Sequence, residues 1–157
     1  MNTQTNFELL SDLDLLDQDI SEIQELAGFE VPTPGEYILG LTVEVKAVND
    51  KTSVVWNFRQ VECIKQNDPE EKPTPADTKF SQMFMLQGEA DKVEIAKRSL
   101  RTQSTAFAEA YGISNLLELT RKMLEMGEIM IGATVSRRFD KEDKEKVYPV
   151  IKNIRLA

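Results

Sequence analysis

Residues 36–62, EYILGLTVEVKAVNDKTSVVWNFRQVE, decide the fold because apolar and polar side chains alternate over two successive stretches. Nearly every second residue from Tyr37 to Ala47 is apolar, which is typical of a half-buried β-strand. The segment VNDKTS, residues 48–53, has the composition of a turn, and residues 53–64 are again rich in β-branched and aromatic side chains. The stretch therefore predicts a β-hairpin.

Three more strands are predicted farther along the chain. Residues 65–79 are Pro-rich, charged and without periodicity, so they predict a long exposed loop before a third strand over residues 79–86. Residues 128–139 and 147–156 predict the last two strands. Gly132 indicates a bulge or tight bend in the fourth strand, and Pro149 places the fifth at a sheet edge or beside a bulge.

A helical insert separates the third and fourth strands. Apolar residues at helical spacing predict a helix over residues 90–111, ended by Gly112. A second helix is expected to be capped by Ser114 and to run to Gly127. One insert, over residues 89–127, between the third and fourth of five strands is typical of the OB-fold, a small partly open Greek-key barrel. The sequence predicts this mainly β fold for residues 31–157.

Composition argues against most enzyme chemistry. The chain has 157 residues, no His and a single Cys, Cys63. It therefore offers no Ser-His or Cys-His pair and no zinc-ligand cluster, and it contains neither common phosphate-binding glycine motif. We expect a non-enzymatic protein without cofactor or metal. No apolar run is long enough to span a membrane, and the lone cysteine favours the cytoplasm.

Charge is distributed unevenly along the chain. Residues 1–45 carry 10 acids and no Lys or Arg, whereas residues 46–157 carry 17 acids and all 19 bases. Residues 12–27 predict an acidic amphipathic helix within an arm over residues 1–30. A helix this short is marginal alone and needs an apolar surface. Its apolar face is the predicted partner-binding surface, formed by Leu13, Leu16, Ile20 and Ile23.

Aromatic and basic residues gather where an OB-fold binds its ligand, on strands two and three and at the 1–2 and 4–5 loops. Aromatic faces stack on bases and cations follow phosphates, so this mixture predicts single-stranded nucleic-acid binding. The candidates are Lys46, Lys51, Trp56, Arg59, Phe80, Arg137, Arg138, Phe139, Lys141, Lys144 and Lys146.

Two alternatives stay open at this point. Trp56 and Phe58 share one strand face, which suits a core stripe as well as a stacking platform, and Phe80 is in the same position. Arg59 lies on the opposite face and is the better candidate for solvent or ligand. Arg137 and Arg138 point to opposite sides of one strand, so at least one of them should be exposed.

Several stretches together resemble a known family. They are PTPGEYILGLTVEVKAV, VVWNFRQVE, KFSQMFML ahead of AFAEAYGIS, and VSRRFDKEDKEKVYPVIKNI. Over about residues 30–157 this layout is similar to the OB-fold single-stranded DNA-binding proteins of tailed bacteriophages. The resemblance implies binding of single-stranded DNA during phage replication or recombination, in the cytoplasm of a bacterial host. It also implies replication or recombination proteins as partners and leaves a homo-oligomer open.

One departure from the family concerns the acidic segment. Family members commonly end in an acidic tail that recruits partners and competes for the DNA site, whereas this chain ends in KNIRLA and carries its acids at the N-terminus. The rival hypothesis is a protein-interaction or virion-structural module whose acidic helix docks on a partner. A DNA mimic is the third. If the arginines and nearby lysines of residues 31–157 are all paired with acids, the protein-interaction hypothesis is favoured over DNA binding.

Overall fold

The computed structural model describes residues 30–139, 141–142 and 146–157. The elements follow the order β1 (Gly35–Val48), β2 (Lys51–Gln66), β3 (Lys79–Met85), α2 (Ala90–Tyr111), α3 (Leu116–Met126), β4 (Ile129–Phe139) and β5 (Val147–Leu156). The predicted strand and helix order is confirmed. The predicted acidic helix lies outside the described residues.

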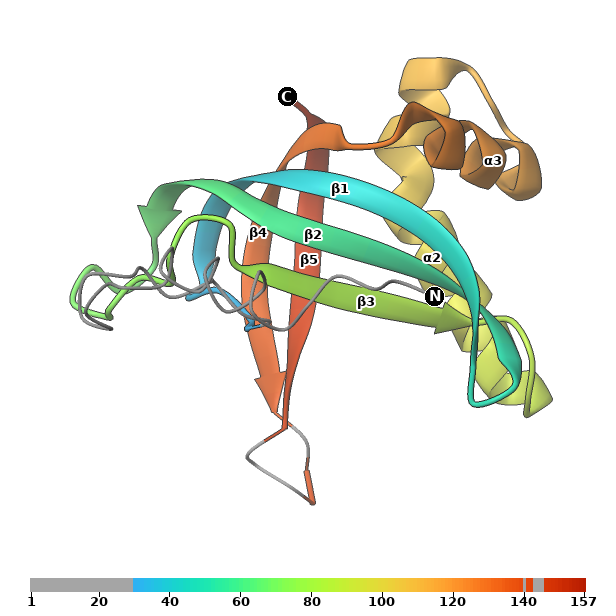
Figure 1. Cartoon of the computed structure of the whole chain (residues 1–157), viewed down its shortest axis with the longest axis horizontal. Helices are drawn as coiled ribbons and strands as arrows, with labels where there is room; N and C mark the ends of the chain where they lie inside the picture. Colours follow the sequence, from blue (N-terminus) through green and yellow to red (C-terminus); the bar gives the residue numbers. More distant parts are fainter. Residues whose placement is uncertain (1–29, 140, 143–145) are drawn as a thin grey trace, which may run out of the picture.

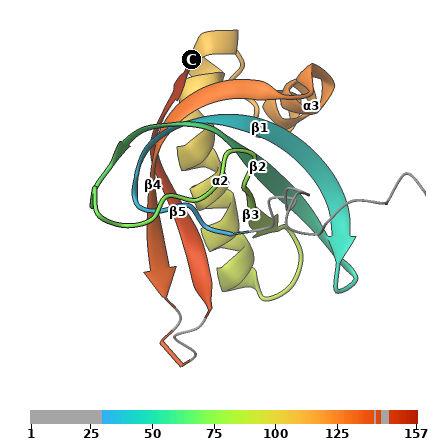
Figure 2. The same cartoon turned by 60° about the vertical axis from the view of Figure 1, so that its left-hand side comes forward.

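The five strands form one antiparallel sheet in the order β3-β2-β1-β4-β5 (Figure 1). β1 is the central strand, pairing with β2 along its whole length and with β4 from Gly35 to Leu41. The sheet curves until its two end strands approach each other, where Gln82 of β3 donates to the Pro149 carbonyl of β5 at 3.2 Å. α2 packs against both end strands (Figure 2). The result is a barrel-like β fold that is open between β3 and β5.

The β1–β2 hairpin closes through a two-residue turn. Asn49 and Asp50 have φ values of 50° and 62°, and the flanking residues Val48 and Lys51 face each other. Two consecutive left-handed residues make a type I′ turn, whose twist matches that of the strands. The hairpin agrees with the sequence prediction, although β2 extends farther in both directions than residues 53–64.

The core lies inside the curved sheet and combines aliphatic side chains with a cluster of aromatic ones. Trp56 contacts Phe107 edge-on at 5.7 Å between ring centroids, and Phe58 stacks on Phe80 at 5.0 Å. Tyr37, Leu39 and Leu41 of β1 are fully buried beside them. The alternation predicted from Tyr37 therefore marks the inner face of the barrel. Beyond Val43 it leaves the core, because Val45 is 48% exposed.

Two local predictions differ from the structure. The N-cap of α3 is Asn115, whose side chain accepts from the Glu118 amide at 3.0 Å, and not Ser114. The 65–79 loop is not uniformly exposed, because Thr74 and Thr78 are buried against Gln60. A polar composition hides this burial, since the buried groups are satisfied by hydrogen bonds to Gln60 of β2 and, for the Thr78 hydroxyl, to the Pro75 carbonyl within the loop.

Other local predictions are confirmed. Gly112 ends α2 in the left-handed conformation, with φ 64°. The β4–β5 register shifts between Gly132 and Thr134, as the predicted bulge requires, and Pro149 lies on an end strand. Within the described ranges, no helix is long and apolar enough to cross a membrane.

Candidate nucleic-acid interface

A groove of about 910 Å³ lies between the β1–β2 and β4–β5 hairpins. We call it the hairpin groove. Lys46 comes from β1, Met83 from β3, Ile95 from α2, and Arg138 and Tyr148 from the β4–β5 pair. Residues from separate elements meet here because β3 and β5 are not paired with each other. Between these two strands, α2 forms the wall of the groove.

Apolar side chains in the hairpin groove are exposed. Ile95 is 63% exposed, Met83 46% and Tyr148 39%, and buried Phe84 and Ile151 form the surface beneath them. Single exposed apolar residues are ordinary on a protein surface, but three around one concave surface make it a candidate binding site.

Cations surround these apolar groups. Lys46, Lys92 and Arg138 line the groove, and no carboxylate is among its described lining residues. Lys46 pairs with Glu44 at 3.1 Å, and both side chains are about half exposed, so the pair contributes little. Arg138 lies over the Tyr148 ring at 5.3 Å from its centroid, a cation–π contact between directly opposite residues of β4 and β5.

One stripe of α2 faces the groove. Lys92, Ile95, Ser99 and Gln103 recur at helical spacing and line it, whereas Leu100, Ser104 and Phe107 are buried on another face. The helix therefore serves both the core and the groove.

The outer face of β1–β3 is a second concave surface, of about 520 Å³, and Arg59 on it is neutralised. Its guanidinium donates to both carboxylate oxygens of Glu128, at 3.0 and 2.8 Å, and to Asp77 at 2.8 Å. The hydrogen bond from Arg59 lowers the pKa of the Glu128 carboxyl below its usual value. A Cβ on Gly40 would lie 2.6 Å from the Glu128 carboxyl carbon, so a larger residue there would displace this carboxylate from its present position.

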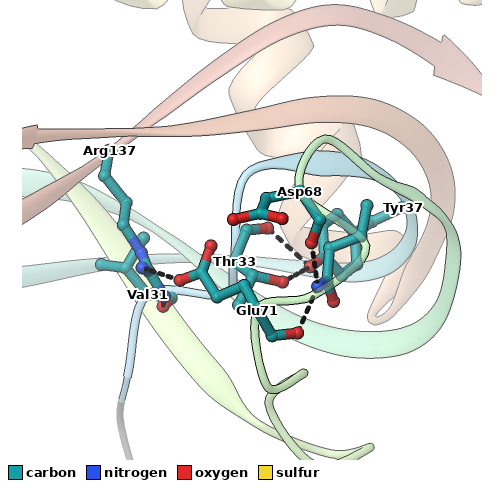
Figure 3. A network of polar contacts seen from close by, with 7 residues as sticks. Val31, Thr33, Tyr37, Asp68, Glu71 and Arg137 are labelled. Carbon is teal, nitrogen blue, oxygen red and sulfur yellow. Dashed lines mark hydrogen bonds and ion pairs between the residues drawn. The ribbon is translucent and has the colours of Figure 1, made fainter.

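Arg137 is also engaged within the fold. It donates to Glu71 at 2.8 Å and to the Val31 carbonyl at 2.9 Å, joining β4 to the 65–79 loop and to the connector ahead of β1 (Figure 3). Beside this contact, the buried Tyr37 hydroxyl donates to the Thr33 carbonyl at 2.6 Å. Burial raises the pKa of Tyr37 to about 12. This network fixes the start of the barrel.

The structure separates the predicted site residues into groups. Trp56 is 1% exposed and Phe80 is also buried, so both belong to the core and neither presents a face to a base. Arg59 and Arg137 are held by carboxylates. Lys46 and Arg138 line the groove. The residues Lys51, Phe139, Lys141 and Lys146 are exposed at the hairpin ends, whereas Leu13, Leu16, Ile20, Ile23 and Lys144 lie outside the described residues.

Of the residues that line the groove, sequence reasoning identified only Lys46 and Arg138, and it missed Met83, Lys92, Ile95 and Tyr148 among others. Side chains alternate between the two faces of β3, so Met83 lies on the face opposite the buried Phe80 and Phe84. This alternation could have identified Met83 as an exposed residue. Tyr148 contacts Arg138 only because of the β4–β5 register, which the sequence does not give. The α2 residues that line the groove can be identified only once the position of α2 relative to the sheet is known.

Within the described part of the chain, no group of three or more His, Cys, Asp or Glu residues is placed to hold a metal ion. The sequence matches no protein-family model, and no curated protein sequence is significantly similar to it.

Proposed function

We propose that this protein is a non-catalytic, sequence-tolerant single-stranded DNA-binding protein with an OB-fold, acting in phage replication or recombination. One observation carries the binding proposal: the hairpin groove combines Lys46, Lys92 and Arg138 with exposed apolar side chains, and its described lining contains no carboxylate. The OB-fold assignment is supported by the strand order and by the helical insert between β3 and β4.

The proposed chemistry divides between phosphates and bases. The three cations bind the backbone, which gives affinity without sequence information. Tyr148 offers an aromatic ring at the groove surface, and Met83 and Ile95 offer apolar contacts to further bases. Stacking tolerates every base because each base has a π-face, and it contributes about 1–3 kcal/mol per base.

A titration of the full chain with oligo-dT over a salt series tests the proposal. Tyr148→Ala should weaken binding roughly 5- to 150-fold, from the loss of one stacked base. Tyr111→Ala is the matched control, because Tyr111 packs against Phe107 and does not line the groove. Absence of binding even near 50 mM salt, where the electrostatic contribution is strong, would refute the function.

The rival function is a protein-interaction module. Arg59 and Arg137 favour it, because both are paired with acids and unavailable to phosphate. Arg138 favours DNA, because it lies over an aromatic ring at the groove. We therefore place the rival second. Capture of a protein partner by a chain that binds no oligonucleotide would reverse this order.

The acidic arm is proposed to compete with DNA or to recruit replication proteins. The first described residue, Glu30, donates its amide to the Lys79 carbonyl at 2.9 Å, so the chain enters the barrel at the start of β3. The next β3 residues with exposed or half-exposed side chains, Ser81, Gln82 and Met83, line the hairpin groove. A segment with 7 acids and no Lys or Arg in residues 1–29 is thus tethered near a cationic groove.

A further inference from the structure

One edge of β1 is only partly paired within the described part of the chain. β4 pairs with β1 only as far as Leu41, whereas β1 continues to Val48. Within the described residues, no other segment forms a backbone hydrogen bond with Val43–Val48 on that side. The opposite side of the hairpin is occupied, because Leu86 and Gln87 bond to the Thr52 backbone of β2. An unpaired strand edge is a template for another strand.

The turn determines which residues present their backbone at this edge. In a type I′ turn the Val48 carbonyl accepts from the Lys51 amide, so Val48 is bonded toward β2. Bonded and non-bonded pairs alternate along an antiparallel ladder, and the register here has no shift after Leu39. The N–H and C=O groups of Val43, Val45 and Ala47 therefore point away from β2.

The edge is self-complementary about Val45. If an antiparallel copy pairs Val45 with its own Val45, then Val43 faces Ala47 and Glu44 faces Lys46 of the other copy. The outward-pointing N–H and C=O groups of Val43, Val45 and Ala47 in one copy are thus opposite those of Ala47, Val45 and Val43 in the other. Opposite charges meet at the two non-bonded positions, where side chains are closest. Val45, 48% exposed in the single chain, would be covered.

We infer that a second copy of this chain pairs with the Val43–Ala47 edge through a two-fold axis at Val45. The interface is isologous, so the same segment serves both copies. Figure 2 shows the β1–β2 hairpin projecting away from α3, and Val45, Lys46 and Ala47 near its tip are exposed. Because the paired segment is short, the dimer is reversible and concentration-dependent. Pairing also joins two hairpin grooves, since Lys46 lines the groove and lies at the interface.

Sedimentation equilibrium of the full chain without nucleic acid tests the inference independently of the proposed function. The wild-type chain should dimerise reversibly. Glu44→Lys and Lys46→Glu should each weaken the dimer, by about tenfold, because each replaces two attractive cross-strand pairs with two repulsive ones. The double variant should restore dimerisation, because the charges are exchanged and complementary again. Weakening without restoration would contradict this register.

Cross-linking provides a second readout. In a Cys63→Ser background, Val45→Cys places two thiols across the axis with Cα atoms about 5.5 Å apart, within disulfide range. Ile64→Cys is the matched control, since Ile64 is equally exposed at 48% but lies away from this edge. Preferential oxidation of the Val45→Cys chain to a dimer supports the inference. A wild-type chain that stays monomeric at every soluble concentration overturns it, as does equal cross-linking of the control.

Discussion

Arg137 and Arg138 are adjacent in the sequence, yet the structure predicts opposite consequences when each is changed to Ala. The Arg137 side chain is 22% exposed and makes two charge-assisted hydrogen bonds, to Glu71 and to the Val31 carbonyl. Its removal leaves both acceptors without their donor. We expect a loss of about 2 kcal/mol in the free energy of unfolding, discounted for partial exposure of the pair. For a domain of this size that lowers Tm by roughly 4–8 °C.

Arg138→Ala should instead act on binding. Arg138 is exposed and its contact is the Tyr148 ring, so its loss should change the unfolding free energy by less than about 1 kcal/mol. If it binds one phosphate, the slope of log K against log salt should become shallower by about 0.7 for a single strand. Changing both arginines would mix the two effects and should be avoided.

Thermal unfolding and oligo-dT titrations of the two single variants separate these effects. Arg121→Ala, an exposed arginine on α3 that does not line the groove, is the control for both measurements. Equal Tm losses for Arg137→Ala and Arg138→Ala would refute the structural role of Arg137. An unchanged salt slope for a folded Arg138→Ala chain would remove Arg138 from the interface.

Three further predictions concern the rest of the fold. Burial raises the pKa of Tyr37 to about 12, so the folded state holds the phenol proton more tightly than the unfolded state does. The free energy of unfolding should therefore be unaffected below pH 10 and should fall by about 3 kcal/mol toward pH 12, as measured by thermal melts at alkaline pH. Tyr37→Phe should remove this pH dependence. Gly40→Ala should lower stability by displacing Glu128, and Gly40→Ala with Glu128→Ala should cost less than the sum of the single changes in denaturant titrations. A chain beginning at Glu30 should stay folded and bind oligo-dT more tightly at low salt if the arm competes with DNA; aggregation would indicate a structural cap, and unchanged affinity would defeat both roles.

Local patterns predicted the elements because their causes are local. Period-2 alternation from Tyr37 follows from one buried strand face, and Gly112 ends α2 because it adopts a left-handed conformation. Parity placed Trp56 and Arg59 on opposite faces correctly. It could not show which face was inward, since that depends on where the sheet curves.

The candidate site was less predictable because its contacts are long-range. Arg59 and Glu128 are 69 residues apart, and Arg137 and Glu71 are 66 apart, so no local spacing reveals that these arginines are paired. Tyr148 and Arg138 meet only once the β4–β5 register is fixed. The sequence could thus identify cations and aromatic residues, but not which of them remain available to a ligand.

The open side of the barrel has a mechanical consequence. Among the described residues, β3 and β5 share no backbone ladder, and the side chain of Gln82 bridges the gap between them by donating to the Pro149 carbonyl. Gln82 is itself held by Gln103 of α2, which donates to it at 2.6 Å. Moving the two strands apart therefore breaks this one hydrogen bond, of about 1 kcal/mol, and no strand pair, and α2 still packs against both strands. The hairpin groove borders this gap, so we expect its width to vary more easily than the spacing between the hydrogen-bonded strands. If the groove binds single-stranded DNA as proposed, such a variable width would admit purines and pyrimidines alike without refolding.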